Sequence, residues 1–485
     1  MRAFPLFRQL RTIVFAIAFA WATPQVIWAQ ESAVRSDLAD STEIQHLLER
    51  LETLEKRFED EIHKTPASVS EDAKGTKESN ASEALGLALP SDASKKTESP
   101  KKKEGWEVRF GGHVQMDYVT WADAAPSIPE TFDYFNFRRL RMLADGKGYE
   151  NYDFRLQMTL EPDNTGDAPL GAVLTPQVKD AYFSLNEIPI LGRFRIGNFF
   201  VPFGLEQVTN DTNNIFLERS IPTQGIFTPD REVGMAIYNC SPNERVAWAT
   251  GVFLDSISEG LKLRRDDNQG YRLSGRLTWL PYYDEASKGR YLVHTGLGIL
   301  YTDDQNDNVR FRARPQVSEG PRIIDTGVLF ADDYTIGNFE AAIVWGRFTV
   351  QSEAYLTQVH MIDGDHTNCN GAYVHMSWFV TGENRIYERF GQHGPQFGRN
   401  VPYVNFACSR TKRGSGALEL KTRWSHLDFN QLQAGQYNDL TVGFNWYWSD
   451  RTRVMFDWIR PITSETAIYG ATSSDLLGTR FDFNW

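Results

Sequence analysis

Arginine is the residue type in this sequence whose spacing most clearly suggests binding chemistry. A guanidinium group can donate two parallel hydrogen bonds to a phosphate or carboxylate, whereas a lysine ammonium acts as a point charge. Three arginines fall within residues 137–141, and others recur nearby at alternating positions. The candidate anion-binding residues are Arg138, Arg139, Arg141, Arg155, Arg195, Arg219 and Arg231, and Arg109 and Arg193 follow the same polar pattern.

Each of these arginines has a second interpretation. A charged side chain that faces the inside of a protein is often neutralised by a carboxylate, and such an ion pair only holds the fold together. The candidate partners are Asp153, Glu161, Asp180 and Glu218. For any single arginine the sequence leaves both interpretations open, but so many arginines together favour a binding surface.

The arginines occur in segments whose side chains alternate between apolar and polar. From residue 152 to 161, Tyr, Phe, Leu, Met and Leu alternate with Asp, Arg, Gln, Thr and Glu. In a β-strand this alternation places the apolar groups on one face and the polar groups on the other. A soluble sandwich would show it with the apolar face inward. Two observations favour a membrane barrel. The segments reach the ~9–11 residues of a tilted membrane strand. Charges also repeat at successive positions of the inward face, and burying such unpaired charges in a dry interior would be unfavourable.

The alternation begins at Trp106 and continues to the last residue, Trp485. A final strand that ends in an aromatic residue is similar to the assembly signal of bacterial outer-membrane barrels. At roughly 22–25 residues per strand and connection, residues 106–485 give about 16 strands. The predicted fold class is therefore an all-β, transmembrane antiparallel β-barrel of about 16 strands, which is wide enough to enclose an aqueous channel.

One long stretch inside the predicted barrel does not alternate. The segment from Arg193 to Tyr238 begins and ends as a strand, but roughly thirty residues between the strands contain three prolines and several Asn and Thr. A connection of this length in a compact all-β chain is uncommon and usually functional. We expect an inward-folded constriction loop that narrows the lumen; the alternative is a long surface loop.

The first 105 residues have a different character. Residues 1–29 have the basic start, apolar core and small-residue cleavage site of a signal peptide. Residues 41–64 carry apolar side chains at heptad spacing and predict a short coiled-coil helix, which either self-associates in the periplasm or lies singly on the barrel rim. Residues 65–105 have few large apolar residues, so we expect a disordered linker. The barrel would then occupy residues 106–485.

Several function classes are disfavoured. The 485-residue chain has a net charge of −12, whereas nucleic-acid binding calls for a basic footprint. No GxSxG motif is present, and no histidine has an evident serine partner, so we predict no enzyme activity. No Cys/His spacing for a metal is present and no EF-hand spacing, so no metal and no cofactor is expected, and Asp303, Asp304, Asp363 and Asp365 are interpreted as solvated loop residues.

Cysteines and turn residues give further expectations. Cys369 and Cys408 could pair in an oxidising compartment, which would leave Cys240 over. Residues 145–147 and 449–451 read as short periplasmic turns, and residues 303–332 and 360–371 as longer extracellular loops.

The segments FNFRRLRMLADGKGYENYDFRLQ, VKDAYFSL, RFRIGNFFVPFGLE, FLERSIP, PDREVGMAIY, FVTGENRIYERFG, GALELKTRWSHLDFN and LTVGFNWYWSDRTRVMFDW span the predicted barrel in order. In these segments the chain resembles the phosphate-selective porin O and P family of bacterial outer-membrane porins. The resemblance implies a homotrimer of 16-stranded barrels, a third extracellular loop folded into the pore, and selectivity for anions such as phosphate or polyphosphate. It also implies that the paired arginines of FRRLR and the arginine of FLERS meet the permeating anion.

The chain departs from this pattern in one respect. Its barrel contains few lysines, and loop acids such as Asp332 and Asp333 would oppose anion capture within a Debye length of ~8 Å. Two alternatives therefore stay open. The chain could be a general or sugar porin that uses Trp446, Tyr447 and Trp448 as an aromatic track, or a structural or adhesive outer-membrane barrel with a lumen blocked to ions.

Overall fold

The computed structural model describes residues 105–161, 176–254, 270–304, 307–409 and 411–485. The predicted signal peptide, the coiled-coil helix and nearly all of the linker lie outside these residues and stay predictions. In the described part of the chain, no helix is long and apolar enough to cross a bilayer.

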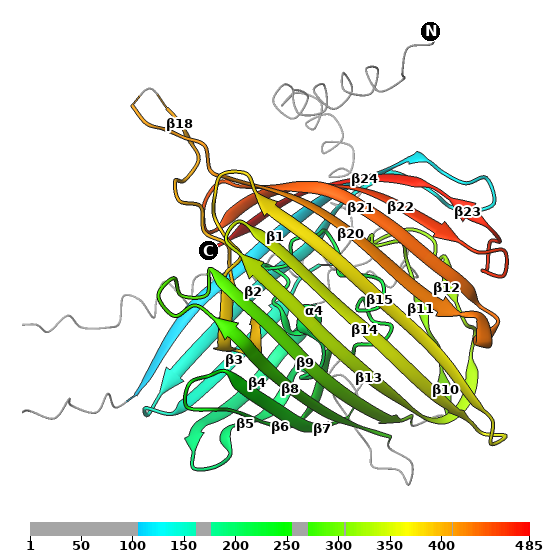
Figure 1. Cartoon of the computed structure of the whole chain (residues 1–485), viewed down its shortest axis with the longest axis horizontal. Coiled ribbons are helices and arrows are strands. Elements are labelled where there is room, and N and C mark those ends of the chain that lie inside the picture. Colours follow the sequence, from blue (N-terminus) through cyan, green and yellow to red (C-terminus); the bar gives the residue numbers. More distant parts are fainter. Residues whose placement is uncertain (1–104, 162–175, 255–269, 305–306, 410) are drawn as a thin grey trace, which may run out of the picture. The chain divides into compact units, whose positions relative to one another are not determined.

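The described residues form a closed β-barrel (Figure 1). Sixteen long strands make its wall, each antiparallel to its neighbours, and β1 pairs with β24 to close the sheet. The predicted fold class and strand number are confirmed. The wall strands are β1 (Trp106–Asp123), β2 (Tyr134–Gly148), β3 (Tyr152–Thr159), β4 (Gln177–Ile188), β5 (Gly192–Phe200), β6 (Arg231–Cys240), β7 (Val246–Phe253), β8 (Tyr271–Tyr283), β9 (Tyr291–Asp303), β13 (Leu329–Trp345), β14 (Phe348–Met361), β15 (His366–Phe379), β20 (Ala417–Phe429), β21 (Gly435–Tyr447), β22 (Thr452–Thr463) and β24 (Asp475–Asn484).

Shorter elements lie in the connections. They are α4 (Leu205–Val208), β10 (Asn308–Val309), β11 (Arg312–Ala313), β12 (Ile324–Asp325), β16 (Tyr387–Gly391), β17 (Gly394–Phe397), β18 (Ala407–Cys408), β19 (Arg413–Gly414), η1 (Asn430–Leu432) and β23 (Thr472–Ser473).

The two faces of the wall differ as the alternation predicts. On β3, Leu156 and Met158 are exposed on the outer face, whereas Gln157 and Thr159 are buried on the lumen side. Exposed apolar side chains recur on the outer face of nearly every wall strand, and the buried charged residues of the strands lie inside. This arrangement suits a barrel whose outside contacts lipid and whose inside is polar.

The two ends of the barrel carry different connections. At the end that we call the turn end, where β1 begins and β24 stops, residues 149–151, 189–191, 346–347 and 448–451 are short turns. At the opposite loop end, residues 201–230 and 304–328 form long connections. One long connection, residues 380–416, lies at the turn end between β15 and β20, and we call it the turn-end insert.

Two turn predictions were wrong. Residues 145–147 lie inside β2, because the Asp145 carboxylate faces the lumen and accepts hydrogen bonds from Arg155 at 2.6 and 2.7 Å. The chain turns at Tyr149 and Glu150, whose φ angles of 47° and 73° suit a tight hairpin turn. Residues 360–371 are mostly strand, since β14 and β15 are joined by residues 362–365 alone.

The cysteine pairing that the sequence left open is not formed. Among the residues described, Cys240, Cys369 and Cys408 are all free thiols. Cys369 lies near the start of β15 at the loop end, whereas Cys408 lies in the turn-end insert, so the two residues are at opposite ends of the barrel.

The constriction segment, defined as residues 201–230, folds into the lumen as predicted. Its backbone is tied to inward-facing side chains of the wall: Leu217 N donates to Asp457 at 2.9 Å, and Arg423 donates to the Glu218 carbonyl at 3.0 Å. Its apolar side chains, including Phe203 and Phe227, bury against Tyr355 of β14. Burying one such aromatic side chain stabilises the segment by about 1.5–3 kcal/mol.

Two further connections turn inward, which the sequence analysis did not predict. In residues 304–328, Gln316 is buried and donates to Ser425 at 3.1 Å on the lumen side of β20. In the turn-end insert, Tyr387 meets His294 of β9 at 2.7 Å, and the Pro395 carbonyl accepts a bond of 2.9 Å from Arg276 of β8. The lumen is therefore narrowed from both ends.

Candidate functional site

A cavity of about 520 Å³ lies between the constriction segment and the wall formed by β2, β3 and β4. Seven cationic and four acidic side chains line it, which gives a formal surplus of +3. The cations are Arg138, Arg139, Arg141, Lys179, Arg219, Arg231 and Arg322, and the acids are Glu161, Asp211, Glu218 and Asp230. Five of the seven predicted site arginines thus meet in one place.

A β-bulge explains how adjacent arginines reach the same cavity. In the β1–β2 ladder, Gln115 pairs with Arg139 and Met116 pairs with Phe137, so Arg138 is the extra, unpaired residue. In a regular strand, neighbours point to opposite faces, and one of the two arginines would face lipid. The bulge re-aims Arg138 and lets both guanidinium groups face the lumen.

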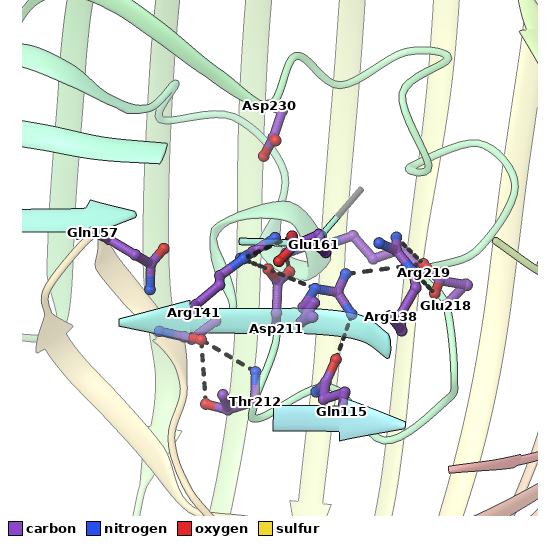
Figure 2. Close-up of polar contacts among 12 residues, drawn as sticks. Gln115, Arg138, Arg141, Gln157, Glu161, Asp211, Thr212, Glu218, Arg219 and Asp230 are labelled. Carbon is purple, nitrogen blue, oxygen red and sulfur yellow. Dashed lines mark hydrogen bonds and ion pairs between the residues drawn. The ribbon is translucent and has the colours of Figure 1, made fainter. Parts of the chain in front are cut away.

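Glu218 of the constriction segment neutralises the first of these arginines. Its carboxylate accepts hydrogen bonds from Arg138 at 2.6 and 3.0 Å, and from Arg480 of β24 at 3.0 Å. Figure 2 shows Glu218 beside Arg138. The constriction segment is therefore clamped between β2 and the last strand of the barrel.

Asp211 contacts three of the cavity arginines, and it was not among the residues predicted from the sequence. Its carboxylate lies 2.8 Å from Arg141 and 2.8 Å from Arg219, both labelled in Figure 2. It also lies 3.3 Å from Arg139. Burial alone would raise the pKa of this carboxyl, but the three guanidinium groups, Arg139 first, hold the pKa well below its ordinary range. No sequence signal could have found it, because alternation is absent from its segment.

Arg219 stabilises the constriction segment as well as lining the cavity. It donates to the carbonyls of Glu206, Gln207 and Thr209 at 3.0 to 3.2 Å, at the end of α4. These are carbonyl groups that a short helix leaves without an internal partner. The arginine of FLERS thus fixes the shape of the segment that carries it.

Two of the cavity arginines contact carboxylates outside the constriction segment. Arg231 binds Asp180 at 2.8 Å and lies 3.9 Å from the centre of the Phe200 ring, and Arg141 lies 3.4 Å from Glu161. The ion-pair interpretation therefore holds for Glu161, Asp180 and Glu218. The fourth candidate partner, Asp153, instead accepts a hydrogen bond from Asn186 at 2.5 Å.

Comparison with known proteins identifies the family. Residues 108–485 match the family model described as phosphate-selective porin O and P. The chain belongs to this family.

Solved structures of outer-membrane proteins are similar to this chain. The anion-selective porin from Comamonas acidovorans is 12% identical, with a TM-score of 0.50, and the match covers 79% of this chain and 100% of that one. OmpTΔL8 of Vibrio cholerae is 10% identical (TM-score 0.49; 78% and 99% covered), and the DcaP channel of Acinetobacter baumannii is 9% identical (TM-score 0.48; 79% and 98% covered). No curated protein matches the chain.

A second cavity, of about 460 Å³, lies in this porin towards the turn end and contains the other two predicted arginines, Arg155 and Arg195. Five cations and three acids line it, a surplus of +2. Arg155 is paired with Asp145. Arg195 lies 3.9 Å from the centre of the Tyr182 ring and donates to Ser184 at 3.0 Å, and within the described ranges it has no carboxylate partner. Arg109 lies at the edge of this cavity, largely exposed, and pairs with Glu107.

Other strands of the wall hold further cations that were not among the predicted site residues. These are Lys421 and Arg423 of β20, Arg453 of β22 and Arg480 of β24, which are buried and each donate to a backbone carbonyl of the constriction segment. The alternation in GALELKTRW could have placed the first two in the lumen. Their role in anchoring depends on long-range contacts that the sequence does not display.

The aromatic residues proposed for a sugar track do not form one. On β21, Tyr447 faces the lumen and donates to Glu419 at 2.7 Å. Trp446 and Trp448 lie on the outer face, where both contact Phe406 at ring-centre distances of 4.8 and 5.4 Å. Aromatic side chains at this position suit the membrane interface.

Proposed function

We propose that this family member is an outer-membrane porin for passive diffusion of small anions, with phosphate or polyphosphate preferred, through an arginine-lined pore. The observation that carries the proposal is the charge of the two lumen cavities. The whole chain has a net charge of −12, yet the cavities carry surpluses of +3 and +2. Charged side chains at a constriction select ions of opposite sign.

The ion pairs in the larger cavity suit transient anion binding. An entering anion can take over hydrogen bonds that a guanidinium group now gives to a carboxylate, since each guanidinium carries five donors. Arg139 illustrates this: it donates to Gln115 at 2.7 Å, but its Nε lies 3.3 Å from Asp211 without the alignment of a hydrogen bond, and its Nη2 lies 3.9 Å from Glu218. Because each such exchange of hydrogen bonds is weak, the anion can leave the cavity as well as enter it.

Phosphate is favoured over halide by geometry. Arg138, Arg139 and Arg141 present planar donor groups to one cavity, and such groups match the oxygens of a tetrahedral oxyanion bidentately. The same argument applies to polyphosphate. These residues, with Arg155, Arg195, Arg219 and Arg231, are the proposed anion-contacting set.

The setting of the porin is part of the proposal. We place the barrel in the bacterial outer membrane as a homotrimer, with lipid against its apolar outer face and the turn end towards the periplasm, as short turns suggest. The coiled-coil helix at residues 41–64 would then lie in the periplasm, because β1 begins at the turn end.

A planar-bilayer measurement on the purified porin tests the proposal. Under a salt gradient we expect a reversal potential that favours chloride, and millimolar phosphate should reduce the chloride current. A reversal potential favouring cations would refute anion selectivity. A barrel that inserts but carries no current would support the structural or adhesive alternative.

A further inference from the structure

One buried glutamate holds the start of the constriction segment. The backbone N–H groups of Leu205 and Glu206 donate to the Glu353 carboxylate at 2.9 and 2.7 Å. These residues form the first turn of α4, whose N–H groups have no partner inside the helix. Gly204 makes this approach possible: its φ is 76°, and a Cβ there would lie 3.1 Å from Glu353 Oε2.

The same carboxylate is surrounded by other donors. Tyr373 Oη donates to it at 2.6 Å and Tyr355 Oη at 2.9 Å, and the Asn338 amide lies at 3.4 Å. Glu353 has no exposed surface, and within the described ranges no cation lies within ion-pair distance of it. The carboxyl group is therefore held by hydrogen-bond donors alone, two of which belong to the constriction segment.

A neighbouring glutamate provides an internal comparison. Glu340 of β13 is directly opposite Glu353 in the β13–β14 ladder and is equally buried. Like charges in this arrangement repel each other. Glu340, however, is neutralised by Arg276 at 2.7 and 2.8 Å and also meets His294 at 3.1 Å. Arg276 and His294 contact the turn-end insert, so the two glutamates serve different inserted segments.

We propose that Glu353 is a positioning residue of the constriction segment: it fixes α4 against β14 and so sets the position of Arg219, the cavity arginine that the segment carries. The consequence for ion passage rests on the proposed function, but the positioning role does not. Glu206, which Glu353 holds through its N–H, accepts bonds from Ser220 Oγ at 2.6 Å and Arg423 at 3.3 Å. Arg219 donates hydrogen bonds to the carbonyls of α4, so movement of this helix displaces the arginine as well.

The substitution Glu353→Gln tests the role with little change in volume. The amide retains one acceptor oxygen, but its NH2 group, which can only donate, replaces the other oxygen and faces N–H and O–H donors, so at least one buried donor loses its partner. Leaving a buried donor unsatisfied increases the population of locally opened states. Val208 of α4 is fully buried and suits a reporter, because Val→Cys is a small change. The three native cysteines are replaced by serine in all proteins compared.

The rate at which a membrane-impermeant thiol reagent modifies the Val208→Cys protein is then measured. We expect Glu353→Gln to accelerate modification about tenfold, whereas Glu340→Gln should change it less than about twofold because its partners contact the other insert. Single-channel current should become larger and noisier in Glu353→Gln alone. Unheated gel mobility confirms that each barrel is folded.

An unchanged modification rate in folded Glu353→Gln would overturn the proposal, as would equal acceleration by Glu340→Gln. If Glu353→Gln does not fold, Tyr355→Phe provides the test, since it removes one donor to Glu353 and should accelerate modification about threefold; no acceleration would also refute the role. Because the chemical reporter does not depend on selectivity, a porin that proves non-selective leaves this inference intact.

Discussion

Arg138 and Arg139 are adjacent in sequence and yet share the lumen, and their surroundings are not equivalent. Arg138 is fully engaged by Glu218, whereas Arg139 shares Asp211 with Arg141 and Arg219. An anion that enters the cavity therefore competes least with existing bonds at Arg139. The alternation alone could identify arginines of the lumen, but only the bulge and the position of Asp211 distinguish one arginine from another.

Charge reversal at Arg139 should weaken anion selectivity. Arg139→Glu lowers the surplus of the larger cavity from +3 to +1, so the anion-to-cation permeability ratio should fall by roughly fivefold. Arg219→Glu should act in the same direction. Arg451→Glu is the matched control, because Arg451 is exposed in the turn at residues 448–451, lines neither cavity, and carries a charge that solvent screens. Reversal potentials in a salt gradient measure all three. Equal anion-to-cation permeability ratios in Arg139→Glu and the parent would show that other residues determine the selectivity.

Removing the central carboxylate should have the opposite effect. Asp211→Asn raises the cavity surplus to +4 and releases three guanidinium groups, so phosphate should block chloride current at lower concentration. The buried arginines lose a charged partner, which should destabilise the folded barrel by about 3 kcal/mol. Phosphate titration of the current and urea-induced unfolding measure the two effects. Weaker phosphate block in a folded variant would contradict the assignment of Asp211 as the competitor of the anion.

The paired carboxylates also determine the expected pH dependence. Arginines hold the pKa values of both Asp211 and Glu218 below their ordinary range. A carboxyl whose pKa is depressed by folding stabilises the protein fully above its unfolded pKa, near 4, and loses this contribution as pH falls through the folded pKa. Between pH 5 and pH 8 both groups stay ionised, so Asp211 should contribute nothing to any pH dependence of the reversal potential, and the parent and Asp211→Asn should change in parallel over this range. A pH-dependent shift in the parent that Asp211→Asn abolishes would show that Asp211 titrates there.

At the scale of elements, the sequence could predict the wall and one of the three inward connections. The wall strands follow from alternation, and the constriction segment follows from its lack of alternation within a long connection. The turn-end insert has the glycines, prolines and polar residues of an ordinary surface loop. Its inward direction depends on contacts such as Tyr387 with His294 and Arg276 with the Pro395 carbonyl, which join residues about a hundred positions apart. Such pairings leave no local pattern.

The turn-end insert should obstruct the pore without being needed for the barrel. β15 and β20 pair directly over ten residue pairs, so the wall closes independently of the residues that join them. Replacing residues 386–398 with a short Gly/Ser linker should keep the folded gel mobility and raise single-channel conductance by about twofold or more. A matched replacement of residues 405–415, whose described members are partly or fully exposed, should leave conductance unchanged. Equal conductance in the two deletions would show that the insert does not narrow the conducting path.

At the scale of the whole molecule, positive and negative charge are separated in space. The cavities carry the positive surplus, while acids gather at the loop end, where Asp303 pairs opposite Asp333 and Asp304, Asp307 and Asp332 lie close by. An overall charge of −12 therefore says little about the lumen. These charges can be counted in the sequence, but their separation in space follows from the closure of the sheet. Closure places the polar faces of the strands inside and the loop residues at one rim.

This separation predicts how selectivity responds to salt. Raising the salt from 0.1 M to 1 M shortens the Debye length from ~10 Å to ~3 Å, which removes the influence of exposed acids at the rim but leaves buried arginines acting at contact distance. The anion-to-cation permeability ratio should therefore change by less than about twofold over this range. The permeability ratio is obtained from reversal potentials recorded at one fixed ratio of salt concentrations across the bilayer, once at low and once at high mean salt. A ratio that falls to unity at high salt would show that selectivity arises from exposed charge at the mouths, and the buried arginines would then be structural ion pairs.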